Sequence, residues 1–471
     1  MKDIGASRRR PTRKLGKVAL AIRHPFSFPD DPTNSTVQHP DHPPLSLDDQ
    51  ALYQPHIRKL SCQPDPFASA SIPIDNVAHD LLQYFRHYST QFPNNFTFTT
   101  DIARILESAV RDELMMNCIL GAAASRLHYM QGTLPSHLAE RAFSSTQQSL
   151  RLLQIRLDED VPATTAPVEL LVDCILYLAA AALYRSDAMS AEIHVKAAVR
   201  LVELSGGLGV LEDPRVLVRM LGLDDVLACM GLRQCSFACT YDPGPLLSPV
   251  GDECQPDSQT THSPPGGRFL MTDTTLPQVL RGLIPQIVEC DRLKDTPSST
   301  EGEPSSNVLL ASRRLNLRIL AIRNRLLAFS GTELTTKAFR AVLIIWTLLP
   351  PNDPRQARNA GVVAQHLMHI LSDNPSSDWA HLEEVRLWWL LVGAFGTFVG
   401  GGGHAWFVER IHGMLQSKRK QIGLASGPDL FKSLIDLQKR FLYRDAVTRP
   451  LTLRLVGLLD SRPRIAWGSV I

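Results

Sequence analysis

The sequence predicts an all-α protein, in which a disordered, basic and Pro-rich N-terminal tail precedes one large multi-helix domain. Two observations support this fold class. In many segments beyond residue 76, apolar residues recur every three or four positions, which is the spacing of one helix face. Prolines and runs of β-branched residues are rare inside these windows, so strands compete poorly as an interpretation. No fixed repeat period stands out, so a solenoid of regular repeats is not supported.

The predicted tail covers residues 1–75. It is rich in Pro, Asp, Ser and His, as in FPDDPTNSTVQHPDHPPLSLDD, and it lacks apolar periodicity, which indicates disorder. Its first part is basic, with Asp3 as the only acid before Asp30. The basic arm consists of Arg8, Arg9, Arg10, Arg13, Lys14 and Lys17.

This basic arm has four interpretations. A compact run of Lys and Arg in a flexible segment is typical of a nuclear-import signal, and we adopt that prediction. An Arg-rich stretch with a single acid is also compatible with a mitochondrial presequence. The arm could bind phosphates weakly and in a salt-sensitive way, or it could be a solvated tail without a partner.

The predicted helical domain covers residues 76–450. Residues 81–88 (LLQYFRHY) place their apolar side chains on one stripe, and residues 137–157 are amphipathic throughout. Residues 111–130 contain a run of small side chains, which lets neighbouring helices approach closely. Residues 167–185 are apolar nearly all round, which predicts a central helix buried by its neighbours.

Prolines, glycines and polar residues predict an exposed loop at 241–268. Asp378 is a candidate N-cap for one of the later helices. Beyond the last predicted helix, residues 451–471 are assigned to a C-terminal tail. After the loop, helical patterns resume at 276–293, 306–329, 333–348, 354–372, 379–398, 404–418 and 428–444.

The segment 191–211 (AEIHVKAAVRLVELSGGLGVL) predicts an amphipathic helix that ends where Gly206 and Gly207 supply left-handed backbone. The order of its residues resembles the fungal-specific transcription factor domain, which is the middle homology region of zinc-cluster regulators. In that family a His-x-x-x-Ala helix ending in Gly-Gly follows a long apolar helix. His194 and Ala198 match that pattern here, followed by the two glycines.

A second resemblance lies in the segment 385–415, which is similar to that family's Trp-rich helix, glycine-rich break and Trp-Phe helix. Weaker matches at 81–88, 120–130 and 437–445 resemble the opening and closing helices of the same domain. Together these matches cover roughly residues 78–450. The residues that carry the second resemblance are Trp388, Trp389, Gly393, Trp406 and Phe407.

The resemblance implies a nuclear, helical regulatory domain, often dimeric and often acting on a metabolic or secondary-metabolite gene set. The chain departs from the family in its cysteines. The family carries closely spaced Cys-x-x-Cys pairs near the N-terminus, whereas none of the eight cysteines here forms such a pair and the first is Cys62. Three explanations stay open: an upstream exon is missing, the protein works through a DNA-binding partner, or the domain has acquired another role.

The bulk composition excludes few classes of protein. A net charge of +2 gives no global reason to expect binding to nucleic acid or membranes. The longest uncharged stretch, Leu387 to Gly403, is too short to span a bilayer. Most cysteines sit in apolar stretches, which is typical of free, buried thiols in a reducing compartment.

Three other patterns are candidates for chemistry, and each has a structural explanation that we prefer. The pairs His366 and His369, and His404 and His412, lack a nearby carboxylate or thiol to complete a metal site. Asp224–Asp225 is similar to the start of a metal-diphosphate motif in helical terpene cyclases, but the later acids are absent, so we expect a solvent-facing or N-terminal helix pair. The glycines at 400–403 are expected to form a flexible break between helices, because no strand precedes them.

The sequence analysis therefore predicts a nuclear, non-enzymatic fungal transcription regulator with no metal and no cofactor. Its expected partners are other transcription factors or co-regulators, with DNA bound only weakly or indirectly, no membrane contact, and a homo- or heterodimeric state. A small-molecule effector in the helical domain is compatible with this prediction. Two alternatives stay open: an all-α interaction or scaffold protein outside the nucleus, and a helical enzyme.

Overall fold

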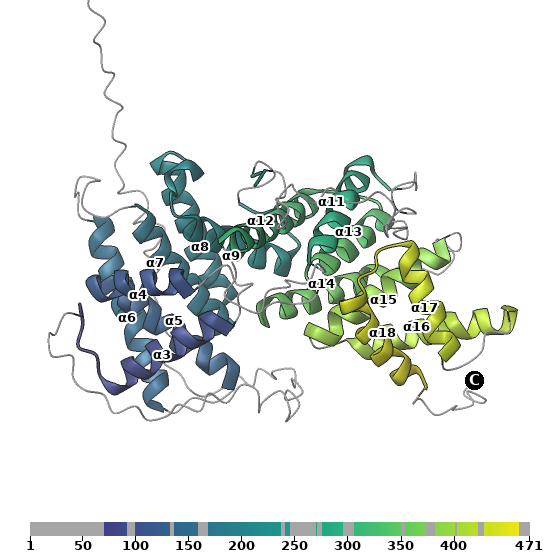
Figure 1. The fold of residues 1–471 in the computed structure, drawn as a ribbon, viewed down its shortest axis with the longest axis horizontal. Coiled ribbons are helices and arrows are strands. Elements are labelled where there is room, and N and C mark those ends of the chain that lie inside the picture. The colour runs from purple at the N-terminus through teal and green to yellow at the C-terminus, as the bar shows by residue number, and fades with distance from the viewer. Residues whose placement is uncertain are drawn as a thin grey trace, which may run out of the picture. The chain divides into compact units, whose positions relative to one another are not determined.

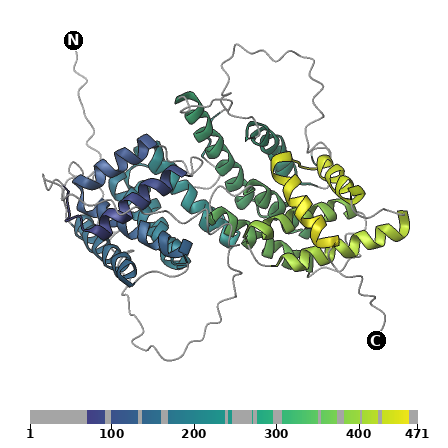
Figure 2. The ribbon, with the colours of Figure 1, turned by 60° about the horizontal axis from the view of Figure 1, so that its bottom comes forward.

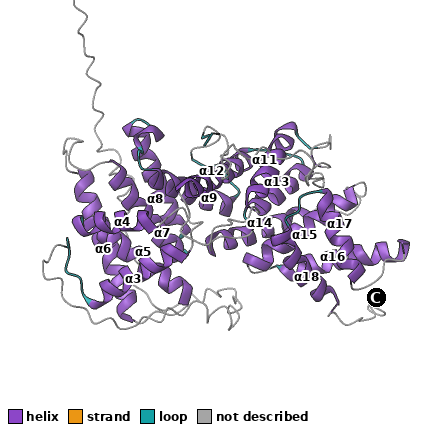
Figure 3. Cartoon of the chain, in the orientation of Figure 1, coloured by secondary structure: helices purple, strands orange, loops and turns teal. Residues whose placement is uncertain are grey.

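A computed structural model describes most of the residues from 70 to 460. These residues form 15 α-helices and one short 3-10 helix, with no strand among them (Figure 3), so the all-α prediction is confirmed. The basic arm, Asp378 and nearly all of the predicted loop lie outside the described residues. The described ranges are 70–91, 99–131, 136–158, 168–236, 241–244, 270, 276–294, 306–349, 354–372, 382–400, 403–422 and 428–460.

The chain divides into two compact units, and the boundary falls between Asp224 and Asp225, inside helix α9 (Pro214–Gly231). The remaining helices of unit 1 are drawn from purple to teal in Figure 1: α3 (Asn76–Gln91), α4 (Thr99–Arg111), α5 (Glu113–Gln131), α6 (Ser136–Asp158), α7 (Val168–Tyr184), α8 (Ala188–Ser205) and the 3-10 helix η1 (Leu208–Val210). Those of unit 2 are α11 (Gln278–Lys294), α12 (Ser306–Ala328), α13 (Leu334–Thr347), α14 (Pro354–Ser372), α15 (Glu383–Gly400), α16 (His404–Ile422), α17 (Pro428–Arg440) and α18 (Asp445–Asp460).

Two features differ from the domain bounds that the sequence analysis drew. One helical domain was expected over 76–450, whereas the helices gather into two units. The C-terminal tail was expected to begin at 451, whereas α18 continues to Asp460. The helix continues because Leu455, Val456 and Leu459 follow its buried face into the core of unit 2.

Unit 1 is built around α5 and α7. Helix α5 packs against α3, α4, α6 and α7, and α7 also packs against α8. Helix α7 is buried on all sides from Leu171 to Tyr184 apart from Ala180, as its apolar sequence predicts. The small residues of α5 allow close packing, since a Cβ added at Gly121 would lie 3.0 Å from the hydroxyl oxygen of Thr146 on α6.

Unit 2 has an aromatic core centred on α13 and α15. Trp388 and Trp389 of α15 are fully buried. The ring of Trp389 meets Phe339 of α13 edge to face at 4.8 Å, and Trp388 stacks on Phe441 at 5.1 Å. Helices α15, α16 and α18 contact one another, and the two ribbon views agree on this (Figures 1 and 2).

Candidate functional site

Helix α8 carries the His-Ala-Gly-Gly pattern, and its two ends are capped as the sequence predicts. At the start, the Asp187 side chain accepts a hydrogen bond from the backbone N–H of Ser190 at 3.0 Å. At the end, Gly206 and Gly207 have φ values of 124° and 92°, which side chains with a Cβ rarely adopt. The N–H of Gly207 reaches back to the carbonyl of Val202 at 2.9 Å and closes the last turn.

His194 and Ala198 lie on the buried face of α8. Burial lowers the pKa of His194 to about 4; the nearby Arg185 lowers it further, and Asp187 acts in the opposite direction. The imidazole is therefore neutral at physiological pH and packs as a core side chain. Arg185 in turn donates to the Ser125 hydroxyl at 3.0 Å, which links the end of α7 to α5.

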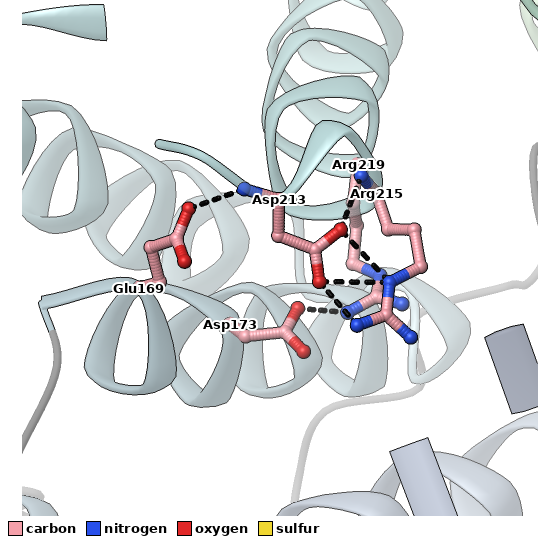
Figure 4. Close-up of polar contacts among 5 residues, drawn as sticks. All are labelled: Glu169, Asp173, Asp213, Arg215 and Arg219. Carbon is pink, nitrogen blue, oxygen red and sulfur yellow. Dashed lines mark hydrogen bonds and ion pairs between the residues drawn. The ribbon is translucent and has the colours of Figure 1, made fainter. Parts of the chain in front are cut away.

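A cluster of acids and arginines joins α7 to the start of α9 within unit 1 (Figure 4). The Glu169 carboxylate accepts the backbone N–H of Asp213 at 2.6 Å. The Asp213 carboxylate accepts both the backbone N–H of Arg215, at 2.9 Å, and its guanidinium Nε, at 2.8 Å. Arg219 forms an ion pair with Asp173 of α7.

The same cluster includes a cation–π contact, because the Arg219 guanidinium lies 4.3 Å from the ring centre of Tyr177. All three carboxylates accept hydrogen bonds from a guanidinium or a backbone N–H, so they hold α9 against α7 rather than presenting a reactive acid. Asp213 followed by Pro214 is a local signature of a helix start. The sequence analysis missed this cluster, and the 44 residues that separate Glu169 from Asp213 gave no local signal for the rest of it.

In unit 2 the glycines of α15 serve close packing. A Cβ added at Gly393 would lie 2.3 Å from the ring of Phe407, and one at Gly400 would lie 2.2 Å from the Ala357 carbonyl oxygen of α14. The expectation of a flexible break at 400–403 is therefore wrong for Gly400, which ends α15 in a tight contact. Gly403 has a φ of 74° and directly precedes α16.

Asp224 and Asp225 are buried in the middle of α9, with 1% and 2% of their surface exposed, so the expectation of a solvent-facing or N-terminal pair is wrong. Asp225 accepts two hydrogen bonds from Nε of Arg323 on α12, at 2.8 and 2.9 Å, within unit 2. Burial raises the pKa of the Asp225 carboxyl, and the Arg323 guanidinium offsets part of that rise. The apolar sequence around the pair gives no sign that Arg323 is the partner of Asp225, because the two residues lie 98 positions apart.

Two arginines donate hydrogen bonds to backbone carbonyls at the C-terminal end of α13. The last carbonyls of a helix have no partners inside the helix itself. Arg323 donates to the Thr347 carbonyl at 3.2 Å, and Arg444 donates to the Leu349 carbonyl at 2.9 Å. Lys294 lies near these groups, and burial lowers its pKa to about 8. Arg323 and Arg444 thereby stabilise the partial negative charge of a buried helix end, which is a structural role.

The described cysteines and histidines show no metal-binding arrangement. Among the residues that the structure describes, no three His, Cys, Asp or Glu side chains are grouped to hold a metal ion. His366 and His369 lie on α14, and His404 and His412 lie on α16. The five described cysteines are free and buried, as expected: Cys118, Cys174, Cys229, Cys235 and Cys290.

None of the described helices is both long enough and apolar enough to cross a membrane. No curated protein and no solved structure matches the chain. The family model of the fungal specific transcription factor domain matches residues 80–394, which include His194, Trp388 and Trp389, whereas Trp406 and Phe407 lie beyond the end of the match. This match covers more than half of the 471 residues, and the chain therefore belongs to the fungal specific transcription factor domain family of transcription regulators.

Proposed function

We propose that this regulator acts in the nucleus on a metabolic or secondary-metabolite gene set, without a zinc-cluster DNA-binding domain of its own. The observation that carries the proposal is the family match over residues 80–394, in a chain whose eight cysteines include no Cys-x-x-Cys pair. A zinc-cluster DNA-binding domain requires thiolates at that spacing to hold its zinc ions. The protein then reaches its genes through other transcription factors or co-regulators, as a homo- or heterodimer, and performs no catalysis.

The polar side chains of unit 1 favour a regulator that performs no catalysis. The carboxylates of Glu169, Asp173 and Asp213 accept hydrogen bonds or form ion pairs, and His194 is a neutral core residue. Polar groups that are satisfied inside the unit favour a structural role for these side chains over a catalytic one.

Nuclear import is tested with a fluorescent fusion of the full chain in a filamentous fungus. Replacing the six basic residues of the arm by Gln is expected to abolish nuclear accumulation, because an import receptor reads their positive charge. A matched variant replaces Arg8, Arg9, Arg10 and Arg13 by Lys, which keeps the charge and is expected to retain the signal. Cytosolic fluorescence of the unaltered fusion would contradict the nuclear proposal.

The zinc question is tested by elemental analysis of the purified full chain. We expect less than one zinc per ten chains, because the sequence lacks the closely spaced thiolates of a cluster. Stoichiometric zinc that survives dialysis would contradict the proposal that the protein works without a zinc-cluster DNA-binding domain.

Transcript profiling after deletion of the gene tests the target set. We expect the changes in transcript level to be confined to a few metabolic gene groups.

A further inference from the structure

Three sulfur-bearing side chains lie in the core of unit 1, where α5 packs against α7. The Cys174 Sγ of α7 lies 3.7 Å from the Met115 Sδ of α5. Cys118 follows Met115 by three positions on α5, and side chains at that spacing lie on the same face of a helix. The contact between Met115 and Cys174 therefore places Cys118 on the part of α5 that meets α7.

The thiols of Cys118 and Cys174 also contact each other. A hydrogen bond between these two side chains, together with burial, raises the pKa of Cys174 well above its usual range. Both cysteines are free rather than joined in a disulfide. Cys118, Cys174 and Met115 are each at most 2% exposed, so two thiols and one thioether meet in a site that water does not reach.

The separation of Met115 from Cys174 is close to that of two sulfur ligands on one metal ion. Metal–sulfur bonds of about 2.3 Å, at tetrahedral or trigonal angles, place two sulfur atoms about 3.8–4.0 Å apart. The 3.7 Å between these two sulfur atoms therefore has to change by only about 0.1–0.3 Å to bind an ion.

The kinds of ligand select among the metals. Thiolate and thioether sulfurs favour soft ions such as Cu(I), whereas carboxylate and carbonyl oxygens favour Mg²⁺ and Ca²⁺. Structural Zn²⁺ takes four ligands from Cys, His, Asp and Glu. Among the described residues no further side chain of these four types joins the two cysteines in a metal-binding group. Two thiolates and one thioether suit Cu(I), which is stable with three sulfur ligands.

The charge of such a site also favours this ligand set. Thiolates rather than thiols bind metals, so each cysteine releases its proton to water as its sulfur binds the ion. Two thiolates and one Cu(I) leave a single negative charge, because the thioether of Met115 is neutral. A third thiolate would add a second negative charge, which a buried site tolerates less well.

We propose that unit 1 binds one Cu(I) ion between α5 and α7, held by the thiolates of Cys118 and Cys174 and by the thioether of Met115. The ion joins two central helices, so its binding stabilises the folded unit. Because the three sulfurs are buried, the ion enters and leaves through local opening of the helices. This proposal departs from the sequence-based expectation of no metal and goes beyond the proposed function.

The test measures the affinity of the full chain for Cu(I) in anaerobic buffer, by competition with the coloured Cu(I) chelator bicinchoninate. The cysteines outside the described residues are first replaced by Ser, so that only the described thiols contribute. In that background we expect about one Cu(I) per chain. C174A is expected to weaken the affinity by about a hundredfold or more, because it removes a direct ligand. The replaced cysteines are Cys62, Cys239 and Cys254.

The variant M115L separates metal binding from packing. Leucine is similar in volume to methionine, so the fold should be preserved and the circular dichroism spectrum unchanged. Loss of the thioether is expected to weaken the affinity for Cu(I) about tenfold. Because M115L conserves the core, it keeps the test valid if C174A is misfolded. The matched control is C290A, which removes a free, buried thiol from α11 of unit 2 and should leave the affinity unchanged.

A second measurement uses thermal unfolding. Cu(I) should raise the unfolding midpoint of the background protein and should leave that of C174A unchanged. Failure of the background protein to take Cu(I) from bicinchoninate would overturn the inference, as would equal affinities of M115L and C290A. Tighter binding of Zn²⁺ than of Cu(I) would overturn it as well. These results do not depend on where the protein acts in the cell, so the inference and the proposed function fail separately.

Discussion

Each unit contains an ion pair between an aspartate and an arginine on α7, α9 or α12, and the two pairs differ in how far water reaches them. In unit 1 the acid–arginine cluster lies at the start of α9, and Asp173 and Arg219 keep 11% and 18% of their side chains exposed. In unit 2 the ion pair of Asp225 with Arg323 is enclosed, with 3% of each side chain exposed. Water reaches the first pair somewhat more than the second, so the loss of the arginine should cost less in unit 1 than in unit 2.

The largest expected effect follows directly from this difference. Arg323→Met leaves the Asp225 carboxyl buried without its partner and should lower the free energy of unfolding by about 3–5 kcal/mol. Arg219→Met in unit 1 should cost less, about 1–3 kcal/mol, because Asp173 and Arg219 keep more of their side chains exposed than Asp225 and Arg323 do. Urea denaturation of the full chain, followed by circular dichroism, measures both losses. Equal losses would contradict the account of the two ion pairs.

Acidification should affect unit 1 through His194. The pKa of this residue is about 4 in the folded protein, below its ordinary value near 6.5, so the unfolded chain binds a proton more readily. Its contribution to stability is complete above pH 6.5 and is lost as the pH falls toward 4. Relative to His194→Gln, the native protein should lose about 2 kcal/mol between pH 6.5 and pH 5.

This pH dependence is measured by urea denaturation of both proteins at a series of pH values. The other titrating groups are common to the two proteins, so the difference between their unfolding free energies isolates His194. A difference that stays constant from pH 7 to pH 5 would contradict the buried, neutral imidazole.

The close packing of α15 on α14 predicts a smaller loss in unit 2. Gly400→Ala places a Cβ 2.2 Å from a backbone carbonyl oxygen, which must move, and should lower the free energy of unfolding by about 1–3 kcal/mol. Gly413→Ala on α16 is the matched control, since an added Cβ there would meet nothing within 4 Å beyond the backbone of its own helix. It should stabilise the helix by up to about 1 kcal/mol, because alanine favours helix over glycine.

The cap of α8 gives the smallest predicted effect. Gly206→Ala forces a Cβ into backbone with a φ of 124° and should lower the free energy of unfolding by about 1 kcal/mol. Gly222→Ala on α9 serves as the control, because that glycine is helical and its added Cβ would meet nothing within 4 Å beyond the backbone of its own helix. Thermal unfolding of the two variants should show a lower midpoint for Gly206→Ala only.

The sequence predicted the helices well, because apolar periodicity and caps are local signals. The predicted helix 354–372 matches α14 at both ends, and Gly206 and Gly207 end α8 as expected. The partners of buried polar groups were not predictable, because Asp225 meets Arg323 only after distant helices pack. Gly400 was misread for the same reason, since its tight contact with α14 has no signature within its own segment.

The central claim is that this family member controls transcription from the nucleus although its sequence holds no Cys-x-x-Cys pair. Chromatin immunoprecipitation of the tagged full chain, combined with transcript profiling of the deletion strain, tests it most directly. The account predicts enrichment at a limited set of promoters whose transcripts change on deletion. Uniform background across the genome, with an unchanged transcript profile, would contradict it.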